Sequence, residues 1–300
     1  MPRHLKTFII WRELRCKVRA FTLFRRAELA PEATLARASR LDPWSRLFLL
    51  EGVGYARGNA GRPLPDLGAA GAIPLTMGWG LSQAVRAIRS VKRGEPPVAP
   101  LGRLAAVCRE QSPPGLAGVA FEGVGLVARL RSHSRVQALA RALAVLGGDL
   151  EASFWHGLGR GLFFVLGDAM PWRSSAGRAL DRALTEPPHL LGRINALAGL
   201  ACAMTLVCLP LPEALDLFLC QHAARIEEAE AFRQGIAAAV LLWRGTTGPG
   251  TLLDRFLAYP SEASGRWEAW VRRPCERALG ERLPALIAKG SWEELFRVPR

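Results

Sequence analysis

A short motif, a glycine followed by any residue and then by glycine or alanine, occurs six times and leads each time into an apolar run. Successive first glycines are 26, 45, 34, 42 and 36 residues apart, close to the period of proteins built from two-helix repeats. Two helix backbones can approach closely where such residues meet, and this packing offsets the cost of a helical glycine, about 1 kcal/mol. The first glycines are Gly52, Gly78, Gly123, Gly157, Gly199 and Gly235.

The stretches between these motifs also have helical patterns. Apolar residues recur at helical spacing, with charges on the opposite face, in residues 134–154 and 212–232, and residues 100–111 and 175–186 have the pattern of shorter helices. Signals for strands are almost absent. The sequence therefore predicts an all-α fold of stacked helical hairpins, about six two-helix repeats in a compact or curved array.

The motif spacing also suggests how the chain is divided. When the motifs are paired in order, the pairs are 71 and 76 residues apart, which is consistent with three larger units from an internal triplication. We expect a helical repeat domain at residues 41–260, with capping helices of the same domain at residues 261–300. Residues 1–40 are expected to form a basic segment packed on the repeats.

The formal net charge of +14 at pH 7 does not by itself indicate nucleic-acid binding. Nearly all basic residues are arginines, and they are scattered apart from a cluster in residues 1–30, without a nucleic-acid-binding motif beside it. Trp11, Phe21 and Phe24 alternate with arginines in that cluster. This pattern suits peripheral contact with an anionic membrane or, as we favour, packing against the repeats.

Cysteine and histidine spacing argues against a metal site, because the six cysteines form no CxxC pair and the five histidines do not cluster. No cofactor motif is visible either, so neither metal nor cofactor is expected. The chain does not open with the pattern of a signal peptide, which predicts a cytoplasmic protein with reduced thiols. The uncharged residues 194–212 approach membrane-spanning length, and we favour a core helix over a membrane-inserted one.

The residue before each first glycine is a candidate for chemistry, because four of these six residues are polar. On helices packed through the adjacent glycine, these side chains could converge on one interior cavity. Buried carboxylates need partners, for which Arg57 and Arg160 are candidates. Two carboxylates, an imidazole and a guanidinium could add or remove protons on an apolar substrate. The candidate catalytic residues are therefore Glu51, Glu122, His156 and Arg160.

A structural interpretation of the same residues stays open. Glutamate in the first turn of a helix is stabilised by the helix dipole, and Ser153 could cap a helix that begins just before His156. Under this interpretation the charged groups pair with one another and support only the fold.

Six segments resemble, in order, the successive motifs of a bacterial family, domain-of-unknown-function family 1702. Members of that family are associated with the biosynthesis of enediyne polyketides. The most specific likeness is GLGRGLFFV, and VRAFTLFRRAEL is similar to the arginine-rich motif near the family's N-terminus. The chain resembles a divergent member, because Phe154, Trp155 and His156 stand where the family has a polar lead. The segments are RLFLLEGVGYARG, TMGWGLSQAVRAI, VAFEGVGLVARL, FWHGLGRGLFFVLGDA, NALAGLACAMTLV and FRQGIAAAVLL.

The resemblance implies a pathway, polyketide biosynthesis, more than a reaction. We expect an accessory or tailoring protein that binds a long apolar polyene intermediate. Because no cofactor motif is visible, the conceivable chemistry is acid–base assisted cyclisation or isomerisation. Trp79, Phe163, Phe164 and Gln234 would be ligand-binding residues in such a site. The alternative is a non-catalytic helical-repeat scaffold that binds a polyketide synthase or an electron-transfer partner through its concave face.

Overall fold

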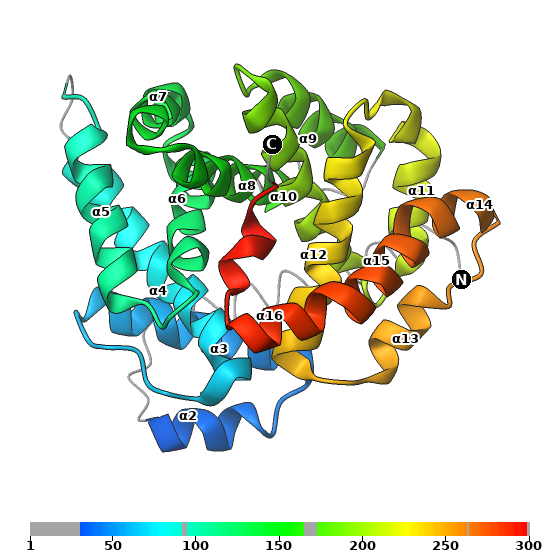
Figure 1. Cartoon of the computed structure of the whole chain (residues 1–300), viewed down its shortest axis with the longest axis horizontal. Coiled ribbons are helices and arrows are strands. Elements are labelled where there is room, and N and C mark those ends of the chain that lie inside the picture. Colours follow the sequence, from blue (N-terminus) through cyan, green and yellow to red (C-terminus); the bar gives the residue numbers. More distant parts are fainter. Residues whose placement is uncertain (1–30, 92–94, 165–172, 263, 299–300) are drawn as a thin grey trace.

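The structure, a computed structural model, describes residues 31–91, 95–164, 173–262 and 264–298 (Figure 1). Within these ranges the chain is helical and forms no strand, which confirms the predicted all-α fold. Each glycine motif lies in a long helix, and we refer to these six as the motif helices. They are α3 (Pro43–Asn59), α4 (Gly68–Ser90), α6 (Ala117–Arg131), α8 (Gly148–Phe164), α10 (Leu190–Cys208) and α12 (Ala229–Thr247).

Shorter helices at the periphery connect most of the motif helices (Figure 1). A helix lies in every connection after α4, whereas residues 60–67 between α3 and α4 hold none, which accounts for the short first interval between motifs. The connecting helices are α5 (Val98–Gln111), α7 (Val136–Leu146), α9 (Arg173–Thr185) and α11 (Pro212–His222), and α2 (Pro31–Ala38) precedes α3.

Successive motif helices pack side by side in chain order and run in the same direction. Near the N-terminal ends of α8 and α10, Glu151 lies 2.7 Å from the ring of His189, and near those of α10 and α12 Arg193 lies 3.1 Å from Glu228. The α8–α10 contact is as extensive as those within the expected pairs, so the helices form one continuous series. α12 also packs against α4, so the series curves back on itself.

The motif glycines lie where neighbouring helix backbones touch. A Cβ atom on Gly157 would be 2.0 Å from the carbonyl oxygen of Glu122 in the preceding motif helix, and one on Gly199 would be 1.9 Å from that of His156. Neither distance is possible for a real side chain, so only glycine allows this approach. The close helix packing predicted from the motif is therefore confirmed.

Local signals explain where several helices begin and end. The Asp42 carboxylate caps α3 by accepting hydrogen bonds from the backbone N–H groups of Trp44 and Ser45, and Pro43 occupies the first turn. The single helix expected over residues 134–154 is wrong, because Gly147 has φ 138° and separates α7 from α8. The helix expected over residues 212–232 also breaks, at a 3₁₀ turn over Ala223–Arg225.

α10 is long and apolar enough to cross a membrane, and no other helix among the described residues is. However, 78% of its apolar stretch is buried inside the protein. Its neighbours α8 and α12 cover it on two sides, which is how a core helix is placed. The basic residues 1–30, including their possible membrane contact, lie outside the described residues.

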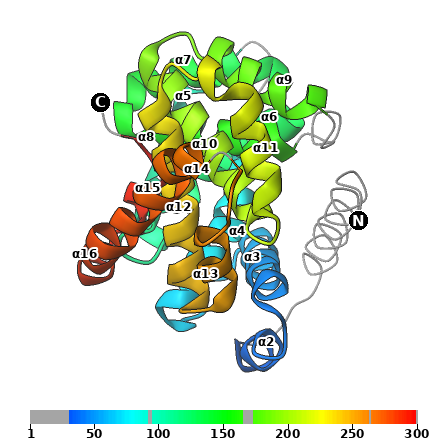
Figure 2. The same cartoon turned by 90° about the vertical axis from the view of Figure 1, so that its right-hand side faces the viewer.

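The last helices follow α12, and the stretch around α15 packs along it (Figures 1 and 2). After α13 (Thr251–Leu257), the helices α14 (Ser264–Trp267), α15 (Arg273–Arg277) and α16 (Leu283–Lys289) are joined by two π-helical turns. Gly290 ends α16 in the left-handed conformation, with φ 65°. Residues 291–298 then leave the helix and lie between α6 and α12 (Figure 1).

Candidate functional site

Three predicted site residues form one buried cluster. The Nδ1 atom of His156 lies 3.0 Å from Oε1 of Glu122, and a terminal guanidinium nitrogen of Arg160 donates to Oε2 of Glu122 at 2.7 Å. Glu122 and His156 are buried almost completely, and Arg160 is 7% exposed. The structure thus brings together Glu122 from α6 with His156 and Arg160 from α8.

The glycine contacts place these residues in register. Because Gly157 lies against the Glu122 carbonyl, the residues just before the first glycines of α6 and α8 become neighbours. Arg160 follows His156 by one helical turn, so it extends from the same face of α8. The backbone contact that holds the helices together therefore also sets the geometry of the cluster.

The surroundings of Glu122 keep it ionised. Burial alone would raise the pKa of its carboxyl group, but the positive charge of Arg160 and the hydrogen bonds from His156 and Arg160 outweigh this and lower the pKa. An ionised carboxylate can only accept hydrogen bonds, so Nδ1 of His156 must carry the proton that lies between them.

Burial lowers the pKa of His156, because desolvation outweighs the attraction of Glu122. The imidazole is therefore neutral near pH 7, protonated on Nδ1, with the lone pair on Nε2. That buried Nε2 atom accepts no hydrogen bond within the described part of the chain, and the Nε–H group of Arg160 is likewise without an acceptor. The cluster thus holds one unused base and one unused donor.

Glu51 of α3 belongs to the same electrostatic group. Burial raises the pKa of its carboxyl group to about 7, and the charges of Arg160 and Glu122 act on it with opposite signs. No hydrogen bond reaches its carboxyl oxygens from the described residues. Near neutral pH, the site therefore combines a fully ionised carboxylate with a carboxyl group that is about half protonated.

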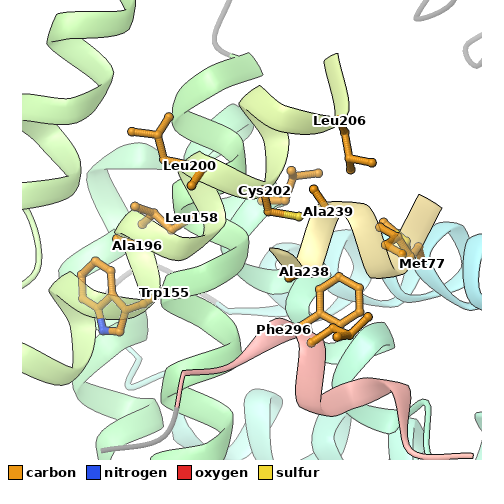
Figure 3. Close-up of a cluster of buried hydrophobic side chains, with 14 of the residues drawn as sticks. Met77, Trp155, Leu158, Ala196, Leu200, Cys202, Leu206, Ala238, Ala239 and Phe296 are labelled. Atoms are coloured by element: carbon orange, nitrogen blue, oxygen red, sulfur yellow. The ribbon is translucent and has the colours of Figure 1, made fainter. Parts of the chain in front are cut away.

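The walls around the cluster are small or apolar. Figure 3 shows Phe296 in one cluster of buried apolar side chains with Met77 of α4, Cys202 of α10, and Ala238 and Ala239 of α12. Burial raises the pKa of the Cys202 thiol to about 12, so it stays protonated. The Phe296 ring meets the His156 ring edge-on, with centroids 5.5 Å apart. Such surroundings suit an apolar group next to the polar atoms.

Phe163 and Phe164 follow Arg160 by about one turn of α8, are half-buried, and pack against each other with ring centroids 5.5 Å apart. They lie on the helix face that carries His156 and Arg160, near the end of α8. Their predicted place beside the cluster is therefore compatible with the structure.

The structure does not bring Trp79 or Gln234, both predicted to bind ligand, to the cluster, and it does not pair Arg57 with Glu51. Trp79 packs at the α3–α4 contact, where its ring lies against Gly58. Gln234 is half-buried, and its amide donates to the Glu230 carboxylate at 3.4 Å on its own helix rather than to the cluster. Arg57 donates to the Pro63 carbonyl at 2.7 Å, so it does not serve as the partner of Glu51.

The expectation that the charged residues lie in first helical turns is also wrong. α8 begins at Gly148, so His156 lies in its middle and Ser153, whose hydroxyl donates to the Asp149 carbonyl, caps nothing. Glu51 lies in the middle of α3 and Glu122 in the second turn of α6. A structural role would thus have to come from ion pairing alone.

Sequence reasoning missed Cys202, Asn195 and Phe296. Cys202 follows Gly199 by three residues, as Arg160 follows Gly157, so an alignment of the motif helices would have placed it at the site. Asn195 lies one turn before Gly199 and binds the backbone of Val298. Phe296 carries no local signal, since only tertiary packing brings it to His156.

Two of the cavities formed by described residues lie away from the cluster. One, of about 580 Å³, is lined by Val91, residues 95–98 and α7. The other, of about 260 Å³, lies between α5, α6, α8 and residues 293–297. Within the described ranges, no group of three or more His, Cys, Asp or Glu side chains could hold a metal ion.

Comparisons with models of protein families, curated proteins and solved structures found no match.

Proposed function

We propose that the protein is an acid–base catalyst that isomerises an apolar, unsaturated substrate. The observation that carries this proposal is the pair formed by Glu122 and a neutral His156 whose Nε2 atom has no partner. A carboxylate that fixes the protonated nitrogen of an imidazole leaves the other nitrogen as a general base. Glu51, with a pKa of about 7, is the matching acid.

The reaction moves one proton off the substrate and one onto it. Nε2 of His156 takes a proton from a carbon next to a polyene that is conjugated to a carbonyl group. The electron pair of that C–H bond shifts along the polyene, while Arg160 Nε–H donates a hydrogen bond to the carbonyl oxygen. Glu51 then protonates a different carbon, so the double bonds move without change in composition. The extra proton on His156 finally returns to Glu51.

Each residue has a physical reason for its part. The negative charge of Glu122 stabilises the imidazolium that forms when His156 takes a proton. The low-dielectric surroundings strengthen the hydrogen bond from Arg160 to developing negative charge. The resemblance to family 1702 supports a polyketide intermediate as the substrate and a role in tailoring it, with a polyketide synthase as the supplier.

The second candidate is a non-catalytic scaffold that binds a synthase or an electron-transfer partner. The double pairing of Glu122 favours it, since an ion cluster that only stabilises the fold would show the same pairing. The two functions differ in whether the free Nε2 atom of His156 takes part in proton transfer.

Deuterium exchange tests the proposal. The protein is incubated in deuterated water with 3,5-heptadien-2-one, a small conjugated dienone. Deuterium at C7, the methyl group at the end of the diene, is followed by NMR. We expect the wild type to incorporate deuterium and His156→Asn to lose this activity. Asparagine keeps an N–H group for Glu122 but removes Nε2. His222→Asn, outside the cluster, is the control, and equal incorporation by all three proteins would favour the scaffold.

A further inference from the structure

Residues 291–298, which we name the C-terminal plug, pack against α6 and α8 and meet the cluster through Phe296. The plug starts with a 3₁₀ turn over Trp292–Phe296 and continues in extended form. Phe296 is 1% exposed and is the residue of the plug that meets His156. The plug therefore occupies the space next to the imidazole with an unsaturated hydrocarbon ring.

Buried apolar side chains and a few polar contacts hold the plug in place. Arg297 also forms an ion pair with Asp149 of α8 at 2.5 Å. The buried amide of Asn195 accepts a hydrogen bond from Val298 N–H at 2.7 Å and donates to the Val298 carbonyl at 3.3 Å. At the other end, Glu293 accepts from Gly118 N–H at 3.0 Å and donates its own N–H to the Gly115 carbonyl at 3.1 Å. The polar contacts join the plug to the starts of α6, α8 and α10.

The chain before the plug has a position suited to a hinge. Gly290 adopts φ 65°, which other residues rarely accept, and a side chain there would meet nothing within 4 Å. α16 ends at this glycine, so rotation about its backbone would move the plug without disturbing the helix. The plug has no regular helical hydrogen bonds to break beyond its own short turn.

We propose that the C-terminal plug is displaced when substrate binds, and that Phe296 occupies the place of a flat, conjugated part of the substrate against His156. This inference rests on the proposed function and adds to it the substrate class and the route of entry. The plug and the substrate then compete for one space. The apparent affinity for substrate is the intrinsic affinity multiplied by the fraction of molecules in which the plug is open.

The competition predicts that weakening the plug strengthens binding. Asn195→Ala removes both hydrogen bonds to Val298 but leaves the cluster residues unchanged. Loss of two hydrogen bonds should raise the open fraction roughly tenfold, and the apparent affinity with it. A plug that is only a fixed wall of the site predicts the opposite sign, because losing it would remove contacts with the ligand.

The experiment uses trans-parinaric acid, a fluorescent conjugated tetraene, with the full-length protein. We expect Asn195→Ala and Phe296→Ala to bind it roughly tenfold more tightly than the wild type. Gln137→Ala, which removes a surface amide that donates to the Glu186 carbonyl, should bind as the wild type does. Stearic acid, which is saturated, should compete weakly.

Hydrogen–deuterium exchange reports on the plug directly. Binding of the tetraene to the wild type should speed exchange at the backbone amides of Glu293 and Val298. The same should hold for His156→Asn, so failure of the proposed catalysis would not hide displacement of the plug. Weaker binding by Asn195→Ala, binding without faster exchange, or no binding by any variant would each overturn the proposal.

Discussion

Replacement of Glu51 by glutamine should change how the stability of the protein depends on pH. The carboxyl group of Glu51 has its pKa raised from 4.5 to about 7 by burial. The folded protein therefore favours the protonated form. Its contribution to stability is complete below the unfolded pKa of about 4.5 and is lost as the pH rises through about 7. Glutamine has a similar shape and stays neutral throughout.

The size of the effect follows from the pKa displacement. Each pKa unit corresponds to about 1.4 kcal/mol, so burial of the ionised form costs about 3 kcal/mol of stability above neutrality. Relative to the wild type, Glu51→Gln should gain stability of this order between about pH 4.5 and pH 8. Glu122 and His156 titrate in both proteins with the opposite sign, because their folded forms favour the carboxylate and the neutral imidazole. The difference between the two proteins therefore isolates Glu51.

Urea unfolding followed by circular dichroism measures the difference at about pH 5 and about pH 8. The variant should have the higher free energy of unfolding at the upper pH and lose this advantage at the lower one. Parallel curves for the two proteins would mean that the carboxyl group titrates normally. The assignment of Glu51 as the acid of the site would then fail.

Three further predictions concern the packing and charges of the array. Glu122→Gln removes the ion-pair partner of the buried Arg160 guanidinium and should cost about 3 kcal/mol in urea unfolding. A loss below about 1 kcal/mol would contradict the buried ion pair. Gly199→Ala should lower the free energy of unfolding by more than about 2 kcal/mol, because the added Cβ would meet the His156 carbonyl. Gly280→Ala is the control: its Cβ would meet nothing within 4 Å, so the free energy of unfolding should change by less than about 1 kcal/mol. Iodoacetamide should label exposed Cys220 in the native protein, as detected by peptide mapping. Buried Cys202, whose pKa is raised to about 12, should stay unlabelled. Equal labelling of the two thiols would show that the core opens readily.

The motif helices could be predicted because each glycine motif does the same thing: it allows close backbone contact with the neighbouring helices. A Cβ on Gly125 would lie 1.9 Å from the Phe154 carbonyl, and one on Gly159 would lie 2.0 Å from that of Ala196, so the second glycine of a motif faces the next helix as the first faces the previous one. The breaks at Gly147 and after His222 were missed because helical periodicity continues across them.

The candidate site could be predicted only where it follows the repeat. Glu51, Glu122 and His156 share a motif position, and Arg160 follows at helical spacing, so a sequence argument could group them. Gln234 shares the position but not the surroundings, because it is half-buried and its amide bonds Glu230 on its own helix. Asn195 bonds Val298 and Phe296 meets His156, in each case across more than a hundred residues of chain. No local pattern encodes such contacts.

Ion pairing explains three members of the cluster but does not explain Glu51. Glu122, His156 and Arg160 satisfy one another, and a stable core could keep them for that reason alone. Glu51 has no hydrogen-bonded partner among the described residues, and its burial lowers stability at neutral pH. An apolar side chain at position 51 would stabilise the fold, so a carboxyl group that destabilises it there indicates a functional role. In that role Glu51 would act as the acid and the Nε2 atom of His156, which has no hydrogen-bond partner among the described residues, as the base.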